Sequence, residues 1–268
     1  MPFANVNGIR MFYDQKGEGE PLLLIMGITA RGEVWEKHLN YWSQYFHCII
    51  ADNRGVGLTD APPGSYSSAE MATDYAGLLE HLDIESCSVI GCSMGSIIAQ
   101  QLAILFPERV SSLVLMCTWS YCDNKTSSIF ELMKIYKERL EPGEFAHYIQ
   151  QLIYSKKTWD DEKQLITFQQ DRKTASSEEV PQSLLGLKGQ ADACIAHNTF
   201  DELRSISQPT LVIGGGEDRF VPDWMLREIA DEIPHSTLYV YKDAGHAFHW
   251  EHIEDFNPRI KKWIIAEK

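Results

Sequence analysis

The sequence of 268 residues lacks the features of a secreted or membrane-spanning protein. Its apolar runs are much shorter than the roughly 20 residues that a transmembrane helix needs. Residues 1–6 (MPFANV) contain no basic segment followed by an apolar one, as a signal peptide would. Six cysteines are scattered without CxxC pairs, so we expect free thiols in a reducing compartment. These absences predict a cytoplasmic protein without a membrane partner.

Basic residues are also scarce, since 24 lysines and arginines face 38 aspartates and glutamates and leave a formal net charge of −14. A surface of this charge repels phosphate backbones, which predicts that nucleic acid is not a partner. The segment Arg54-Gly55-Val56-Gly57 lacks the spacing and the lysine of a P-loop, so we interpret it as a tight turn.

Metal-binding patterns are missing as well. The segment from His246 to His252 contains three histidines and a glutamate, but no H-E-x-x-H motif, and no second group of ligands has a suitable spacing. We therefore expect His249 and His252 to be surface residues and predict no metal site.

What the sequence does contain is an alternation of short apolar runs with helical stretches. The runs are continuous, which is typical of strands buried on both faces of a sheet. A hairpin around Asn7-Gly8 precedes them. This order predicts an α/β fold with a doubly wound, mostly parallel sheet. The predicted buried strands are Leu22–Met26, Cys48–Ala51, Cys87–Ile90, Val110–Met116, Thr210–Ile213 and Thr237–Tyr241.

Residues 119–208 interrupt this alternation. They are rich in helix formers and aromatic residues and lack strong strand signals. Because the segment lies between two predicted core strands, we interpret it as a helical cap inserted over the carboxyl edge of the sheet. The core then comprises residues 1–118 and 209–268.

The pentapeptide Gly91-Cys92-Ser93-Met94-Gly95 is the strongest functional signal. It follows an apolar strand and opens a helical stretch, which is the context in which G-x-S-x-G forms a nucleophile elbow. The turn is too sharp for bulky flanking residues, and it presents the serine hydroxyl at the carboxyl end of the strand. We interpret Cys92 as a filler residue beneath the turn rather than as a reactive thiol.

A serine hydroxyl is a poor nucleophile, so it needs a base and an acid that orients the base. Asp218 and His246 each follow a predicted strand in the second half of the chain. Because the carboxyl ends of parallel strands meet at one edge of a sheet, these side chains can converge on Ser93. Glu217 is the nearest alternative acid, whereas we expect Asp243 to be a turn residue.

Five short motifs follow one another along nearly the whole chain: Met26-Gly27, Asp52-Asn53-Arg54-Gly55-Val56-Gly57, Gly91–Gly95, Gly216-Glu217-Asp218 and Gly245-His246. With them the chain resembles the α/β-hydrolases that carry an inserted helical cap, and it is similar to their carboxylesterase, enol-lactonase and haloperoxidase-like branch. The resemblance implies that Ser93 is the nucleophile, Asp218 the acid and His246 the base. Some members place the acid after the strand that follows the elbow. Here the first carboxylate beyond that strand is Asp123, so Asp218 is the better choice.

Acyl transfer also needs backbone donors for the negative charge that develops on oxygen. The residue after the nucleophile supplies one, so we predict the N–H of Met94. The second should come from the loop after the strand Leu22–Met26, where we prefer the N–H of Ile28 to that of Gly27. The cap should line an apolar pocket, and Trp119 is the preferred pocket residue because it lies just beyond a strand end near the elbow.

These residues predict a serine hydrolase that cleaves a small carboxylic ester or lactone through an acyl-enzyme on Ser93, without a cofactor. Perhydrolysis or C–C bond hydrolysis on the same three residues is one alternative, since pocket polarity would separate these reactions. Another is a ligand-sensing receptor with slow or no turnover, because a fold does not imply a function. The intact set of Ser93, Asp218 and His246 favours the enzyme. The sequence contains no signal for an oligomeric state.

Overall fold

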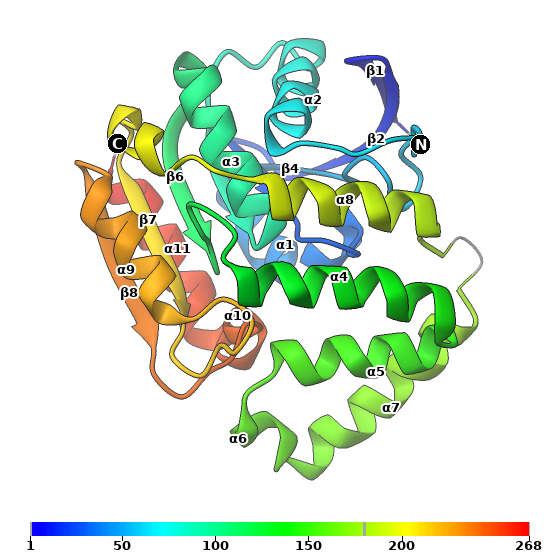
Figure 1. Cartoon of the computed structure of the whole chain (residues 1–268). Coiled ribbons are helices and arrows are strands. Elements are labelled where there is room, and N and C mark those ends of the chain that lie inside the picture. Colours follow the sequence, from blue (N-terminus) through cyan, green and yellow to red (C-terminus); the bar gives the residue numbers. More distant parts are fainter. Residues whose placement is uncertain (1, 179–180, 268) are drawn as a thin grey trace.

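The computed structural model describes residues 2–178 and 181–267. Within these residues the chain forms one eight-stranded sheet with helices on both faces (Figure 1). The strands are β1 (Phe3–Val6), β2 (Ile9–Lys16), β3 (Pro21–Ile25), β4 (His47–Ala51), β5 (Cys87–Cys92), β6 (Val110–Met116), β7 (Thr210–Gly215) and β8 (Ser236–Tyr241).

The strand order across the sheet is β1-β2-β4-β3-β5-β6-β7-β8. The pairs β1–β2 and β2–β4 are antiparallel, and every neighbouring pair from β4 to β8 is parallel. The mostly parallel sheet that the sequence predicts is therefore confirmed. The antiparallel edge begins with the expected hairpin, where Asn7 and Gly8 have positive φ angles of 45° and 78°.

The helices follow the strands in the alternating order expected of a doubly wound sheet. None of those in the described ranges is long and apolar enough to cross a membrane. They are α1 (Glu36–Trp42), α2 (Ser68–His81), α3 (Met94–Leu105), α4 (Asn124–Arg139), α5 (Pro142–Ile153), α6 (Lys156–Trp159), α7 (Glu162–Ser176), α8 (Leu184–Ala196), α9 (Asp223–Glu232), α10 (Phe248–Glu251) and α11 (Ile253–Ala266), with short 3-10 turns at Gly32–Trp35, Pro107–Arg109 and Phe200–Ser205.

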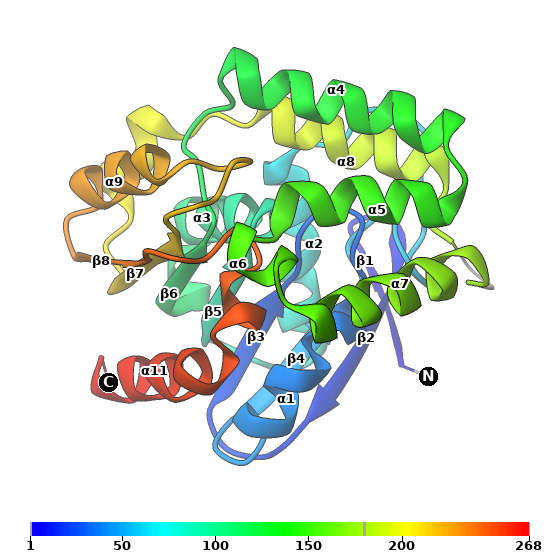
Figure 2. The ribbon, with the colours of Figure 1, turned by 90° about the horizontal axis from the view of Figure 1, so that it is seen from below.

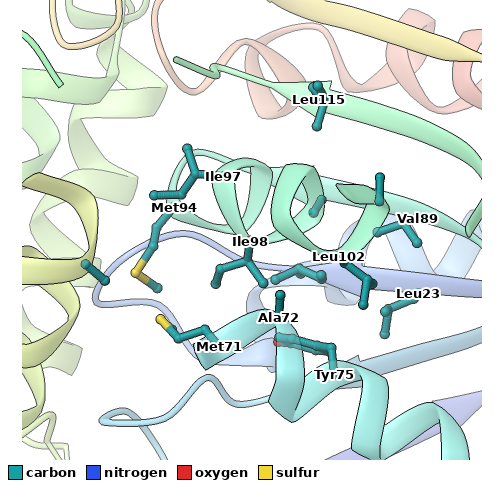
Figure 3. Close-up of a cluster of buried hydrophobic side chains, with 14 of the residues drawn as sticks. Leu23, Met71, Ala72, Tyr75, Val89, Met94, Ile97, Ile98, Leu102 and Leu115 are labelled. Carbon is teal, nitrogen blue, oxygen red and sulfur yellow. The ribbon is translucent and has the colours of Figure 1, made fainter. Parts of the chain in front are cut away.

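Two hydrophobic clusters hold the helices against the two faces of the sheet. Successive side chains of a strand point to opposite faces. Leu22 and Leu24 of β3 therefore join the cluster that contains α1, α10 and α11, whereas Leu23 and Ile25 join the one that contains α2, α3 and α9. Figure 2 shows α1 and α11 together on one side, and Figure 3 shows α2 and α3 packed against β3 and β5 on the other. Burial on both faces explains the continuous apolar runs of the central strands.

The segment between β6 and β7 is helical and contains α4 to α8. In this layer α4 lies beside α8, and α5 lies beside α7 (Figures 1 and 2). This helical segment contacts the loop after β8, where the N–H of Ala247 donates to the carbonyl of Ile153 at 2.8 Å. The division into a core of residues 1–118 and 209–268 and a cap of residues 119–208 stays a prediction. Residues 1, 179–180 and 268 of these ranges lie outside the described part of the chain.

Candidate active site

Ser93 lies at the turn between β5 and α3 in a strained backbone conformation, with φ 55° and ψ −121°. Both flanking glycines are required by close packing. A Cβ atom on Gly91 would lie 2.3 Å from the carbonyl oxygen of Gly95, and one on Gly95 would lie 2.1 Å from that of Ile25. Such strain at a single non-glycine residue is typical of a functional turn. The expected sharp elbow is thus present.

Asp218 and His246 come from the loops after β7 and β8, and their side chains meet. His246 Nδ1 lies 2.7 Å from Asp218 Oδ2, and both residues are buried. The other carboxylate oxygen, Oδ1, accepts hydrogen bonds from the N–H groups of Phe220 at 2.8 Å and Val221 at 2.9 Å. The carboxylate is therefore fixed, and a proton on Nδ1 leaves Nε2 of the imidazole free to act as a base.

Ser93 and His246 line the same cavity, which has a volume of about 140 Å³. Ser93 Oγ is buried and has no hydrogen-bond partner within the described part of the chain. A hydroxyl in a cavity that a histidine also lines, with no protein group bound to it, is available for reaction with a bound molecule.

The alternative acids lie elsewhere. Glu217 is exposed, and its side chain accepts a hydrogen bond from the N–H of Lys156 at 3.3 Å. Asp243 is exposed and pairs with Lys157 at 2.7 Å. Asp123 caps α4 by accepting from the N–H of Thr126 at 2.7 Å. Each of these carboxylates has a local structural role, so the geometry favours Asp218.

The backbone groups expected to bind an oxyanion flank Ser93. Met94 is the first residue of α3, and the first N–H groups of a helix have no intrahelical acceptor. Gly27 packs on the serine, because a Cβ atom there would lie 3.1 Å from Ser93 Cβ, and Gly27 and Ile28 both line the cavity. The positive end of the α3 dipole also points at this position. The choice of Met94 and Ile28 as donors stays a prediction.

The structure does not bring Trp119 to this cavity, and the expected pocket role is wrong. Trp119 is fully buried away from the described cavity lining, against Phe130 at 5.9 Å between ring centroids and against His197 at 6.5 Å. The indole instead belongs to the hydrophobic cluster that also contains Phe130 and Met133 of α4.

The cavity wall is mostly apolar and comes partly from the cap. Sequence reasoning missed these residues, because helical spacing shows that α4 and α5 have apolar faces but not which side chain reaches the serine. The wall includes Ile28, Met133, Ile149, Ile153, Phe220 and Trp250.

His249 also lines the cavity and is buried, so the expectation of a surface position is wrong for this residue. Its Nδ1 lies 2.9 Å from His38 Nε2, and His38 Nδ1 lies 2.6 Å from Asn257 Oδ1. Burial lowers the pKa of His249 well below its usual range and that of His38 to about 4. The two rings are therefore neutral at pH 7. Because Asn257 Oδ1 accepts from His38 Nδ1–H, His38 Nε2 carries no proton and accepts from His249 Nδ1–H. His249 Nε2 is then also an acceptor, and it lies 3.9 Å from Cys92 Sγ.

Cys92 and Cys117 are buried thiols next to the predicted catalytic residues. Burial raises the pKa of Cys92 to about 12 and that of Cys117 well above its usual range, so both stay protonated at neutral pH. Potential ligand atoms of Cys117, Asp218 and His246 lie within 4.8 Å of one another. However, the Cys117 thiol donates to the carbonyl of His246 at 3.1 Å, and metals bind the thiolate rather than the thiol. This donor set fits a hydrogen-bonded support for the Asp–His pair better than a metal site.

Comparison with known proteins agrees with this fold. The family model described as the alpha/beta hydrolase fold matches residues 20–253. A Mycobacterium tuberculosis protein named "Putative non-heme bromoperoxidase BpoC" is 32% identical over 265 residues, which cover 97% of this chain and 99% of the relative. The chain therefore belongs to the alpha/beta hydrolase family.

Solved structures of relatives superpose over nearly the whole chain. The crystal structure of the same Mycobacterium tuberculosis protein has a TM-score of 0.87 at 31% identity and covers 96% of both chains. A thermophilic esterase from Thermogutta terrifontis has a TM-score of 0.86 at 25% identity and covers 100% of this chain and 99% of that one. A protein of Azorhizobium caulinodans named "Putative carbamate hydrolase RutD" is 26% identical over 92% of each chain.

Proposed function

We propose that the protein is a serine hydrolase that cleaves a small, uncharged carboxylic ester or lactone through an acyl-enzyme on Ser93. The observation that carries this proposal is the cavity shared by the unengaged Ser93 hydroxyl and by His246, whose Nδ1 is held by Asp218. Membership in a hydrolase family supports it, as does the likeness to a named esterase.

In the proposed mechanism, His246 Nε2 takes the proton of Ser93 as the hydroxyl oxygen attacks the acyl carbon. The carbonyl oxygen becomes an oxyanion that accepts hydrogen bonds from the N–H groups of Met94 and Ile28. His246 then gives its proton to the leaving alcohol, and the acyl–serine ester remains. A water molecule, deprotonated by His246, attacks that ester. The bond from the acyl carbon to Ser93 Oγ then breaks, the acid leaves, and His246 returns the proton to Ser93 Oγ, while Asp218 stabilises the imidazolium in each half-reaction.

The size and the polarity of the cavity restrict which acyl groups it can hold. Its volume of about 140 Å³ is below the 300–1,000 Å³ typical of pockets for drug-sized ligands. Among the described residues its lining includes no lysine, arginine, aspartate or glutamate. An ionised substrate group would lose its hydration there without gaining a partner. We therefore expect a short, uncharged acyl group.

A wider groove next to the cavity supports the same conclusion. Trp250 lines both the cavity and this groove, which has a volume of about 510 Å³, so we infer that the groove is the approach path. Its described lining contains six carboxylates and two lysines, a formal charge of 2 − 6 = −4. Anionic substrates are repelled along such a path, whereas neutral ones are not.

The proposal is tested with p-nitrophenyl esters of increasing acyl length and a panel of lactones, comparing the wild type with Ser93→Ala. We expect turnover that depends on Ser93 and is highest for short acyl chains. Labelling by a fluorophosphonate probe should likewise require Ser93. Equal turnover by the two proteins would refute the nucleophile, and labelling without steady-state turnover would favour the ligand-sensing receptor.

Perhydrolysis is a second candidate, favoured by the name of the 32% identical bromoperoxidase relative. In that reaction hydrogen peroxide replaces water in the attack on the acyl–serine ester, and the product is a peracid. The test adds peroxide and bromide to an assay with a short-chain ester and measures bromination of monochlorodimedone. Bromination that needs both Ser93 and the ester supports this reaction, and its absence during ester turnover excludes it.

A further inference from the structure

Gln190 of α8 joins the cap to the loop beside the predicted nucleophile. The residue is fully buried. Its Oε1 accepts a hydrogen bond from the N–H of Thr29 at 3.1 Å, and its Nε2 donates to the carbonyl of Arg54 at 2.8 Å. Oε1 also accepts from Gln182 Nε2 at 2.8 Å. Because two donors face the oxygen and a carbonyl faces the nitrogen, the amide has one orientation, with its oxygen toward Thr29.

The loop that Gln190 holds is the one expected to supply the second oxyanion donor. It runs from Met26 to Thr29, and its residues line the cavity. Thr29 has a φ of 71°, which is a costly conformation for a β-branched residue and needs support from its surroundings. The N–H of Ile28 lies one residue before the bond to Gln190, so its direction depends on how the backbone of Thr29 is held.

The core holds the other end of the same loop. Asn53 Nδ2 donates to the carbonyl of Met26 at 2.8 Å, and Asn53 Oδ1 accepts from the hydroxyl of Tyr75 at 2.9 Å. The loop is thus held by the core at its first residue and by the cap at its last.

The carbonyl that anchors Gln190 belongs to a rigid part of the core. The Arg54 side chain is buried and donates to Asp74 through Nε at 2.7 Å and through Nη2 at 2.6 Å. Since both partners of this ion pair are buried, the backbone of Arg54 is a fixed reference point for the Gln190 amide.

We propose that Gln190 is a positioning residue for the oxyanion site: by accepting from Thr29 N–H it aims the Ile28 N–H at the substrate oxygen. The inference rests on the proposed function, since it presupposes an oxyanion formed at Ser93. With this role for Gln190, the packing of α8 against the core affects catalysis, because the cap then orients an oxyanion donor and also forms part of the cavity wall. A small error in the direction of such a donor raises the free energy of the transition state but changes the affinity for the substrate little.

The test compares Gln190→Met with Gln190→Glu. Methionine has a similar volume and removes the acceptor, whereas glutamate keeps an oxygen for Thr29 N–H in either protonation state. For Gln190→Met we expect a kcat roughly 10- to 100-fold lower, somewhat less than the loss of a whole oxyanion donor, with KM within about 3-fold of wild type. The affinity for a trifluoromethyl ketone, whose hemiketal oxyanion mimics the transition state, should fall by the same factor. Gln190→Glu should keep kcat within about 5-fold of wild type.

Asp192→Asn is the matched control. Asp192 lies on the same helix and also ties it to its surroundings, accepting from Ser65 Oγ at 2.7 Å and from Lys134 Nζ at 2.5 Å, but it does not contact the Met26–Thr29 loop. We expect its kcat and inhibitor affinity to equal those of wild type. A melting temperature for each variant shows that the protein is folded.

Two results would overturn the inference. One is an unchanged kcat in folded Gln190→Met. The other is an equal loss of kcat in Asp192→Asn, which would indicate general loosening of the cap. If Gln190→Met does not fold, a tenfold or larger loss of kcat in folded Gln190→Glu also contradicts the inference. Failure of the proposed function is seen separately, as turnover by the wild type that does not depend on Ser93.

Discussion

His246 Nδ1 and Asp218 Oδ2 lie 2.7 Å apart in a buried pair, although the two residues come from different loops. Their meeting is explained by the pairing of β7 with β8 as parallel neighbours, which places both loops at the same edge of the sheet. The carboxylate is held in turn by two backbone N–H groups, so the imidazole is oriented before any substrate binds.

Asp218→Asn should abolish most of the activity, because an amide NH₂ facing Nδ1 favours the wrong tautomer of His246. We expect kcat to fall roughly 10³- to 10⁴-fold. Glu217→Gln is the control, since Glu217 is exposed and its side chain accepts only from the N–H of Lys156 among the described contacts. Steady-state kinetics on a short-chain ester measure both variants, and a larger loss in Glu217→Gln would move the acid to that position.

Trp250→Ala should shift the substrate preference toward longer acyl chains, because Trp250 lines both the small cavity and the groove and we infer that its side chain separates them. We expect kcat/KM for the longest esters of a p-nitrophenyl series to rise roughly tenfold relative to the acetate. Trp224→Ala is a matched deletion of an exposed indole on α9, 40% accessible, and should leave the preference unchanged. An identical chain-length profile in wild type and Trp250→Ala would refute the role of this side chain as the partition.

His197 should contribute to acid sensitivity of the fold. The ring is buried, with Nδ1 2.8 Å from Ser68 Oγ, and burial lowers its pKa from 6.5 to about 3. Between these two values the unfolded chain binds a proton that the folded protein does not. The contribution of the neutral ring is therefore complete above pH 6.5 and is lost as the pH falls toward 3, at about 1 kcal/mol per pH unit.

Urea unfolding of wild type and His197→Gln at several values between pH 7.5 and pH 4.5 measures this contribution. Because glutamine does not titrate, we expect the stability advantage of wild type to shrink steadily below pH 6.5. A difference between the two proteins that stays constant over this range would show that His197 is protonated in the folded state as readily as in the unfolded one.

Asp74→Asn should destabilise the protein by about 3 kcal/mol, because it removes the buried one of the two carboxylates that pair with the Arg54 guanidinium and leaves only the more exposed Glu70. Glu138→Gln is the control, since Glu138 pairs with Lys188 at 3.8 Å between two exposed side chains and should cost less than about 0.5 kcal/mol. Denaturant midpoints give both values. Equal effects of the two substitutions would show that burial of the Arg54–Asp74 pair is energetically irrelevant.

Much of the fold was predictable because its signals are local. Continuous apolar runs predicted the buried strands, and the Asn7-Gly8 turn predicted the hairpin that the positive φ angles confirm. Gly91 and Gly95 predicted the sharp turn at Ser93, since a Cβ atom at either position would collide with neighbouring backbone. These features depend on backbone geometry within a few residues, which the order of amino acids specifies directly.

The wrong predictions concern where side chains point. Trp119 was expected in the pocket and lies in the core, and His249 was expected at the surface and lies in the cavity wall. Both positions follow from how loops and helices pack after the strands have paired, and no local pattern in the sequence encodes this packing.

The sequence by itself determined the alternating elements, the turn that strains Ser93, and the loops on which Asp218 and His246 lie, because periodicity and glycine geometry act over short distances. Only the tertiary structure decided which carboxylate meets His246, which cap side chains enclose the serine, and that Gln190 holds Thr29 across 161 residues of sequence. Contacts of this kind arise from the packing of the cap on the sheet edge, and their partners are brought together only when the whole chain has folded.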